Sequence, residues 1–286
     1  MKNLVISSID LFGWNEMKLW ATSLRESGYD GDAVVIAYRI SDPNLVSMAA
    51  DYNVSLMQAS VDFQNQPINH NEQPHHKTTV NRNRFFHKAW YLMQLSEPYD
   101  WVISTDLRDV IFQKNPTDFM EMWEGNQCDA KILASSEGQL YENEMWNKED
   151  QISAHGSIVW ALKMHNAPVR NAGVIAVKGT RAADLFLNIF FSCKYNTEVA
   201  GDQAAYNLLL DTAYKNESVT VTHETPWACQ CHSAFSSQQL RESFVEPLPY
   251  HKDGVCYTRN EEKFIIVHQY DRIPELKSSI EARYGV

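Results

Sequence analysis

The sequence predicts an α/β fold built on one mostly parallel sheet. In the first hundred residues, short apolar runs of strand length alternate with segments whose apolar residues recur at helical spacing. Turn and cap residues separate these segments, among them Gly28, Asp42 and Pro43. Strands that alternate with helices join through right-handed crossovers into a parallel sheet. We therefore expect a β-α-β-α-β-α-β arrangement in this part of the chain.

Each element of this part has its own signal. The four predicted strands cover residues 3–9, 32–40, 53–59 and 100–105, all rich in apolar residues. The first helix, 14–28, carries apolar residues at i, i+3, i+4 and i+7, namely Met17, Trp20, Ala21 and Leu24. A short helix follows with Asp42 as its cap and Pro43 at its first position. A polar loop at 62–77 precedes a longer helix at 78–96.

The second half of the chain is less regular. Strands are expected at 130–137, 173–179, 219–223 and 263–268, and helices at 180–194 and 202–215. There is no repeat, no low-complexity tract and no Gly/Ser linker, and 44% of the 286 residues are apolar. A chain of this kind can bury a large core. We expect a single domain over residues 1–286.

Composition excludes some classes of function. The net charge of −11 disfavours non-specific nucleic-acid binding, which depends on Lys and Arg, and also disfavours anionic membranes. No stretch approaches the ~20 apolar residues of a membrane span, and the first residues lack a signal-peptide layout. Five cysteines, an odd number, indicate reduced thiols. The expected location is the cytoplasm.

The segment "WVISTDLRDVIFQ", residues 101–113, places two acids where an apolar strand ends. Asp106 and Asp109 can form a turn in which one acid pairs with Arg108. They can equally hold a hard divalent cation such as Mn²⁺ or Mg²⁺, which prefers oxygen ligands. Ligands bind beyond the carboxyl ends of the strands in such sheets, so the position favours the second interpretation.

Four further sites carry polar residues beside predicted elements. Asn171 and Gly173, at the start of a strand, are either a turn or a backbone held close to a ligand. Asp202 is either the cap of a helix or a carboxylate that faces a substrate, and Gln203 lies beside it.

His268 ends a strand and is either a structural histidine or a third metal ligand. Arg82 and Arg84, on the helix that precedes the two aspartates, are either a solvated face or phosphate ligands.

The segment "ACQCHS" contains Cys229, Cys231 and His232, while Cys256 lies elsewhere in the chain. Structural zinc sites usually combine two close pairs of ligands, and this C-x-C-H has no partner pair at such a spacing. The sequence pattern therefore does not predict a zinc site. G-x-S-x-G, P-loop and G-x-G-x-x-G motifs are also missing, which disfavours serine hydrolases, P-loop NTPases and dinucleotide-binding enzymes.

The ordered set "STDLRDVIFQKNP", "NAGVIAVK", "DQAAYN" and "VHQYDR" resembles nucleotide-sugar-dependent glycosyltransferases of the GT-A fold. It looks closest to a group with D-x-R-D-V-x-F-Q and H-Q-Y-D-R motifs in viral, bacterial and plant proteins. The order N-x-G then D-Q-x-x-x-N is also similar to glycogenin-type and plant cell-wall transferases. The resemblance implies one GT-A domain, with a nucleotide-binding half at about 1–115 and an acceptor half at about 116–286.

The resemblance also implies roles for individual residues. The metal ligands would be Asp106, Asp109 and His268, and the ion Mn²⁺ or Mg²⁺. The nucleotide sugar would contact the segment from Ser7 to Asp10 and the later N-A-G and D-Q motifs. The predicted donor-binding residues are Ser7, Asp10, Arg82, Arg84, Asp106, Arg108, Asn171, Ala172, Gly173 and Gln203. The usual D-x-D is here lengthened by one residue, with Arg108 in the third position. Which aspartate holds the metal therefore stays open, and one of them could bind ribose.

The predicted activity is transfer of a sugar from a nucleoside diphosphate sugar, with UDP as the expected nucleotide, to a hydroxyl of a carbohydrate or glycoprotein. The "DQ" pattern leans towards retention of anomeric configuration. If the reaction inverts, a carboxylate must deprotonate the acceptor, and Asp202 and Glu137 are the candidates. Two alternatives stay open at this stage: a metal-dependent phosphatase or nucleotidase, and a non-catalytic binder of sugar nucleotides.

Overall fold

The computed structural model describes residues 2–11, 13–40, 42–59, 73–126, 129–156, 164–193 and 201–285. Its centre is a seven-stranded sheet in the order β3-β2-β1-β4-β7-β6-β8, which confirms the predicted α/β class. The first four strands of this order run parallel, β7 is antiparallel to both of its neighbours, and β8 is parallel to β6. The strands are β1 Asn3–Asp10, β2 Asp32–Tyr38, β3 Val54–Gln58, β4 Trp101–Thr105, β6 Ile132–Leu140, β7 Pro168–Lys178 and β8 Ser218–Val221.

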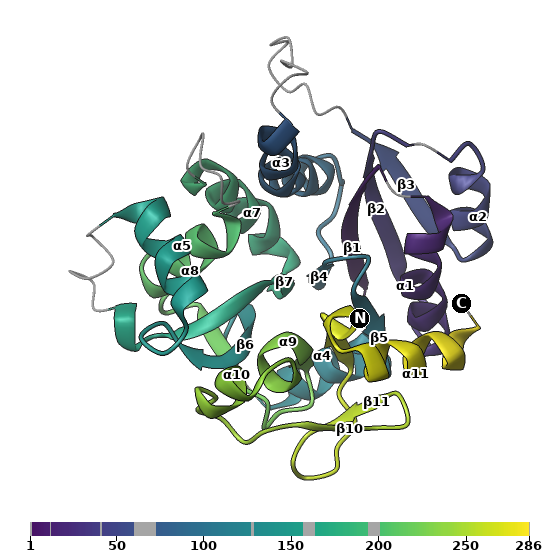
Figure 1. Ribbon diagram of the computed structural model, residues 1–286. Coiled ribbons are helices and arrows are strands. Elements are labelled where there is room, and N and C mark those ends of the chain that lie inside the picture. The colour runs from purple at the N-terminus through teal and green to yellow at the C-terminus, as the bar shows by residue number, and fades with distance from the viewer. Residues whose placement is uncertain are drawn as a thin grey trace.

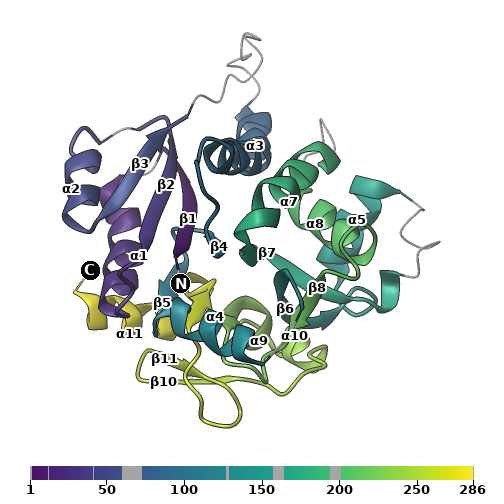
Figure 2. The same cartoon turned by 180° about the vertical axis from the view of Figure 1, so that it is seen from behind.

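Helices cover both faces of this sheet because its strands are apolar on both sides. Val5 and Ile103 pack on the face that α1 covers, whereas Ile6 and Val102 pack on the face of α3 and α7. Figure 1 shows α3 and α7 together on one side of the sheet and α1 on the other, and Figure 2 shows the same layers from behind. The larger helices are α1 Trp14–Glu26, α2 Leu45–Asp51, α3 Gln73–Met93, α4 Pro116–Gly125, α5 Met145–His155, α7 Gly179–Ser192 and α8 Asp202–Asp211.

The first helix follows its sequence pattern closely. Its four predicted apolar positions, Met17, Trp20, Ala21 and Leu24, are all fully buried. Gly28 lies beyond its end at a φ of 87°, a left-handed conformation that glycine adopts at little cost. Among the described residues, no helix is at once long and apolar enough to cross a bilayer.

A second, smaller sheet brings distant parts of the chain to the carboxyl end of β4. Its order is β5-β12-β9, with β12 antiparallel to β5 and parallel to β9. A two-stranded hairpin and the helices α9, α10 and α11 complete this region at the lower side of Figure 1. The elements are β5 Val110–Phe112, β9 Ala228–Gln230, β12 Ile266–His268, β10 Tyr250–Lys252, β11 Val255–Tyr257, α9 Cys231–Phe235, α10 Gln238–Glu242 and α11 Pro274–Tyr284.

Several element boundaries differ from the prediction. The second helix starts at Leu45 with Asn44 at its cap, because the carboxylate of Asp42 accepts the Asn44 N–H and forms a turn instead. The cap of α8 is Gly201 in the left-handed region, so Asp202 is the first helical residue rather than the cap. Helix α3 begins at Gln73, inside the predicted loop, whose part at 62–72 lies outside the described residues.

Strand β7 is longer than predicted. It begins at Pro168 rather than at Gly173, so Asn171 lies within the strand and the turn interpretation of this segment is wrong. The pairing with β6 changes register between Ala134 and Ser136, an irregularity that accommodates the early part of the strand. Two polar side chains of β7 are therefore held inside a sheet rather than in a loop.

Candidate active site

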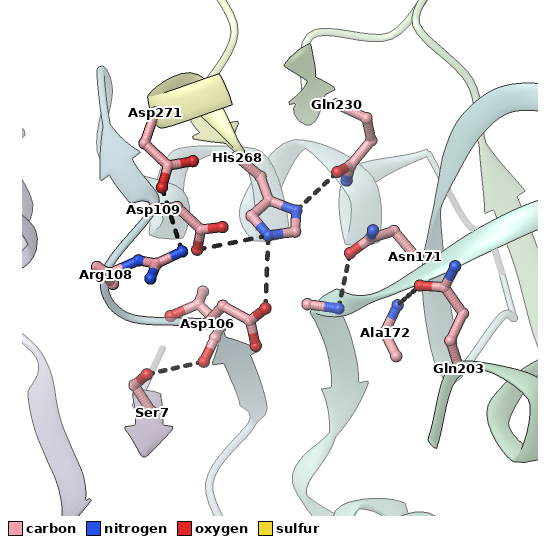
Figure 3. Close-up of polar contacts among 12 residues, drawn as sticks. Ser7, Asp106, Arg108, Asp109, Asn171, Ala172, Gln203, Gln230, His268 and Asp271 are labelled. Atoms are coloured by element: carbon pink, nitrogen blue, oxygen red, sulfur yellow. Dashed lines mark hydrogen bonds and ion pairs between the residues drawn. The ribbon is translucent and has the colours of Figure 1, made fainter. Parts of the chain in front are cut away.

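Two carboxylates and one imidazole converge at the carboxyl end of β4. The Nε2 atom of His268 lies 3.5 Å from Oδ2 of Asp106 and 3.7 Å from Oδ1 of Asp109. One ligand atom from each of the three residues lies within 4.8 Å of the others. Figure 3 shows the three side chains pointing toward a common centre. This donor set, two oxygens and one nitrogen, suits a hard or borderline divalent cation.

Backbone hydrogen bonds hold the two aspartates in place. The N–H of Asp106 donates to the carbonyl of Gly173 at 2.7 Å, which ties the end of β4 to β7. The carbonyl of Asp109 accepts the N–H of Gln269 at 2.8 Å, next to His268. The turn at 106–109 therefore joins the large sheet to the small one. The predicted strand-end position is correct, and β12 supplies the histidine.

The imidazole of His268 is oriented by Gln230. Its Nδ1 lies 2.7 Å from Oε1 of Gln230, an amide oxygen that can only accept, so Nδ1 carries a proton and, in the neutral ring, Nε2 carries the lone pair. That Nε2 is buried and makes no hydrogen bond to any residue the structure describes. A buried nitrogen lone pair between two carboxylates fits a metal ligand, and Gln230 acts as the partner that fixes the tautomer.

We expect Gln230→Leu to weaken Mn²⁺ binding by roughly 10- to 100-fold, because the ring of His268 loses the acceptor that fixes its tautomer and orientation. Isothermal titration of the purified protein with Mn²⁺ measures this effect. Gln238, whose side chain is exposed on α10, offers a control at Gln238→Leu. An unchanged affinity in Gln230→Leu would show that the hydrogen bond does not orient a metal ligand.

The charges of the three groups depend on one another. Burial raises the pKa of Asp109. Burial also disfavours ionisation of Asp106, but Arg84 and then His268 outweigh it and hold the pKa of Asp106 well below its usual range. For His268, burial lowers the pKa, yet Asp109 and Asp106 reverse the effect and raise it overall. Without a cation, His268 and Asp109 are therefore easier to protonate than isolated groups, and a divalent cation would compete with those protons.

Arg84 lies between two carboxylates from distant segments. Its Nη1 binds Oδ1 of Asp106, and its Nη2 donates to Oδ2 of Asp202 at 2.7 Å. Its side chain is only 15% exposed, so the pairs are little screened by water. Helix α3 therefore connects the candidate metal cluster to the first turn of α8. The sequence indicated a phosphate-binding role for this arginine, and the structure places it on the two acids.

The other predicted donor-binding cations have different neighbours. The guanidinium of Arg108 pairs with Asp271, at an N–O distance of 3.2 Å; Figure 3 marks this contact. The alternative in which Arg108 forms a salt bridge with Asp106 or Asp109 is therefore not what the structure shows, because its partner is Asp271. Arg82 is buried against α7, where its Nε donates to the carbonyl of Phe190 at 3.0 Å.

The two predicted donor-binding residues of β1 differ in surroundings. The hydroxyl of Ser7 is buried and donates to the carbonyl of Thr105 at 2.8 Å, directly before the first aspartate. Asp10, at the end of β1, binds the guanidinium of Arg39 through two hydrogen bonds. Ser7 thus supports the end of β4, and Asp10 lies at the carboxyl edge of the sheet.

Glu137 is the centre of a buried network of amides. Its carboxylate accepts hydrogen bonds from Asn171 at 2.8 Å, from Gln203 at 3.0 Å and from Asn147 at 3.2 Å. Gln203 also accepts the N–H of Ala172 at 3.1 Å. Burial raises the pKa of Glu137 even though the amides of Asn171 and Gln203 oppose the shift. The network joins β6, β7, α5 and α8 and fixes the amides beside the metal cluster.

Gly173 allows β7 to lie close against the metal cluster. A Cβ atom at this position would stand 2.5 Å from Cε1 of His268 and 2.8 Å from Oδ2 of Asp106. Any larger residue would push the histidine and the carboxylate apart. The close approach of this backbone to His268 and Asp106 is a property of the fold, because only glycine leaves room for both neighbours.

Three residues that lie in this site were not predicted from the sequence. Gln230 lies in a short strand with no pattern of its own, and Asn147 lies on a helix that was not predicted. Lys88 belongs to the basic stretch noted on α3; its Nζ is buried, donates to Ser104 at 2.8 Å, and burial lowers its pKa to about 7. Helical spacing offered a signal for Lys88, since residues 84 and 88 are one turn apart.

Asp150, on α5, is a buried acid near the site. One carboxylate oxygen has no hydrogen-bond partner within the described ranges, and burial, followed by the charge of Asp202, raises its pKa to about 7. Because the folded state holds this proton more tightly than the unfolded chain, the group stabilises the fold at low pH, and this contribution is lost as the pH rises through about 7.

We expect Asp150→Asn to raise the melting temperature by several degrees at pH 8 and by clearly less at pH 5, because the unfavourable buried charge forms progressively as the pH rises towards the pKa of about 7. Differential scanning fluorimetry at both pH values measures this, with the exposed Asp118→Asn as the control. An equal shift at the two pH values would contradict the raised pKa.

Comparison with solved structures defines the class of fold. The galactosyltransferase LgtC, solved with donor and acceptor sugar analogues, superimposes with a TM-score of 0.55 over 99% of this chain and 94% of its own, at 14% identity. The glycosyltransferase GlyE of Streptococcus pneumoniae matches with a TM-score of 0.54 at 12% identity. That match covers 99% of this chain and 63% of GlyE. The fold is therefore the GT-A fold of glycosyltransferase structures, as the motifs predicted.

No protein-family model and no curated protein matches the sequence. Structural similarity at this level of identity shows the fold, so a functional conclusion depends on the geometry of the site itself.

Proposed function

We propose that this chain is a Mn²⁺- or Mg²⁺-dependent glycosyltransferase that uses a nucleoside diphosphate sugar. The observation that carries the proposal is the position of Asp106, Asp109 and His268 together at the carboxyl end of β4 in a GT-A fold. Ligands bind at this edge of an α/β sheet. A divalent cation held there would offset the charge of a diphosphate leaving group.

The residues around the cluster have defined tasks in this proposal. Asp106, Asp109 and Nε2 of His268 would hold the cation, while Gln230 keeps the histidine in the correct tautomer. Arg84 pairs with Asp106 and Asp202 and so fixes the positions of both carboxylates. The amides of the Glu137 network, and the backbone of β7 at Gly173, would line the donor sugar.

Asp202 is the acid that we propose faces the sugar and the acceptor hydroxyl. Glu137 already accepts hydrogen bonds from three amides, which makes it a positioning residue for Asn171 and Gln203. Asp202 accepts only from Arg84 and from the N–H of Gln203 among the described contacts, which leaves it the more available carboxylate. The acceptor in this proposal is a hydroxyl of a carbohydrate or glycoprotein, and the donor is a UDP-sugar.

The test is a panel of UDP- and GDP-sugars incubated with the protein and Mn²⁺, with free nucleoside diphosphate as the readout. We expect one UDP-sugar to release UDP slowly without acceptor, because water can replace the acceptor, and excess EDTA to stop the release. Inorganic phosphate in place of UDP would instead indicate a phosphatase. Tight binding of a sugar nucleotide with no product in any condition would contradict the transferase proposal.

A further inference from the structure

Three buried cysteines meet in the small β5-β12-β9 region, away from the carboxylate cluster. The sulfur of Cys231 lies 4.0 Å from that of Cys229 and 4.0 Å from that of Cys256. All three sulfurs lie within 4.8 Å of one another, and all three side chains are fully buried and free of disulfides. Cys256 comes from the β10–β11 hairpin, so two separate segments of the chain supply this cluster.

The spacing of the sulfurs matches tetrahedral thiolate coordination. With metal–sulfur bonds of about 2.3 Å, the sulfurs of a tetrahedral zinc site lie about 3.8 Å apart. The observed separations of 4.0 Å thus need only a small contraction around an ion. Soft thiolate ligands select zinc over the hard cations that the carboxylate cluster suits.

The candidate for a fourth ligand is His251, which is not part of the close group of three sulfurs and would have to turn from Phe235, against which its ring packs. It lies directly opposite Cys256 in the register of β10 and β11, so both side chains project from the same face of the hairpin. The N–H of Cys256 donates to Gln113, and its carbonyl accepts from Phe264. The two residues therefore form a non-hydrogen-bonded pair, the type whose side chains come closest.

The surroundings explain why a metal would matter here. The three strands of the small sheet have three residues each, and so do both strands of the hairpin. A two-stranded hairpin such as β10–β11 is marginally stable without support. An ion held by Cys229, Cys231 and Cys256 would cross-link the hairpin to the sheet, as structural zinc does in small folds.

We propose that Cys229, Cys231, Cys256 and His251 form a structural zinc site that stabilises this region. The proposed zinc site and the candidate active site share strand β9, whose successive side chains point to opposite faces. Cys229 lies on one face of the strand in the thiol cluster, and Gln230 lies on the other, where it orients His268. Zinc binding displaces the thiol protons into solvent and leaves thiolates as ligands.

The ordinary interpretation of buried cysteines is that they are small apolar side chains. It explains a single thiol such as Cys193, which packs at the end of α7. It does not require three sulfurs from two segments to meet at one point.

The test uses the full chain, freed of metal by a chelator under reducing conditions and then titrated with Co²⁺. We expect one equivalent to give the near-ultraviolet thiolate-to-cobalt band and the intense visible bands of tetrahedral coordination. Zn²⁺ should abolish both signals. Asp109→Asn should keep the thiolate band, which separates this site from the carboxylate cluster.

Matched variants identify the ligands. Cys229→Ser and Cys256→Ser should lose the thiolate band or weaken Co²⁺ binding at least tenfold, whereas Cys193→Ser should behave as the unmodified protein. His251→Ala should keep the thiolate band and shift the visible bands; unchanged visible bands would remove His251 from the site. Because the Co²⁺ titration of the unmodified chain needs no variant, failure of a variant to fold does not weaken the test.

Two results would overturn the proposal. One is the absence of a thiolate-to-cobalt band although all cysteines react with a thiol reagent after unfolding. The other is a disulfide between two of the three cysteines, found by mass spectrometry in protein purified without reductant.

Discussion

Asp109→Asn should reduce metal-dependent release of nucleoside diphosphate by at least about a thousandfold, while the protein stays folded. The amide keeps the size of the side chain but removes one anionic ligand from the three that converge on the site. Because burial raises the pKa of Asp109, the loss of its charge should leave the metal-free protein as stable as before or more so. Turnover and the melting temperature, each with and without Mn²⁺, measure the two effects.

Two controls sharpen this result. Asp118→Asn changes an exposed acid on α4 and should affect neither turnover nor the Mn²⁺-induced rise in melting temperature. Asp109→Asn should lose that rise together with the activity. Full activity in Asp109→Asn, or activity that excess EDTA leaves unchanged, would exclude Asp109 as a metal ligand in the reaction.

Arg84→Met should lower the free energy of unfolding of the metal-free protein by about 3–5 kcal/mol, because it leaves two carboxylates buried without their shared cation. The side chains of Arg84, Asp106 and Asp202 are 15%, 30% and 12% exposed, so solvent screens them little. Arg84→Lys should recover only part of the loss, since an ammonium lacks the planar fork that reaches both acids. Urea unfolding at fixed pH measures these differences.

The matched control is Arg181→Met, which removes an exposed arginine paired with Glu217 and should have a much smaller effect. Mn²⁺ should partly restore the stability of Arg84→Met, because the ion supplies positive charge to Asp106 in place of the guanidinium. A loss in Arg84→Met no larger than in Arg181→Met would show that this arginine does not neutralise the two buried acids.

The parallel half of the sheet was predictable because its signals are local. Strands β1 to β4 and helix α1 are found within a few residues of their predicted bounds. The burial of Met17 and Trp20 follows directly from their helical spacing. The strand-end position of Asp106 was predictable for the same reason, since a buried apolar run ends at Thr105.

The second half was harder to predict because its elements are short and their patterns weak. Strands of three residues, such as β5 and β9, carry no detectable periodicity, and the backbone of β9 owes its place to pairing with β12. The start of β7 at Pro168 was missed because Asn171 and Gly173 have the composition of a turn. Packing against β6 overrides that local preference.

The ion-pair partners of Arg84 and Arg108 could not be predicted from the sequence. Both arginines were candidates for the phosphate of a donor, and their residue type allows nothing more specific. In the folded chain Arg84 pairs with Asp106 and with Asp202, which lies in another helix, and Arg108 pairs with Asp271. These partners are far apart along the chain, so their pairing depends on how helices and strands pack.

Residue order and periodicity were sufficient for the α/β class, the parallel strands and the acids at the end of β4, because such features depend on neighbours a few positions away. The choice of Gln230 as the partner of His268, the link from Arg84 to two acids and the meeting of Cys256 with Cys229 came from the folded chain alone. These contacts join segments separated by tens of residues or more. Their geometry arises when the small sheet closes against the large one, which no local pattern encodes.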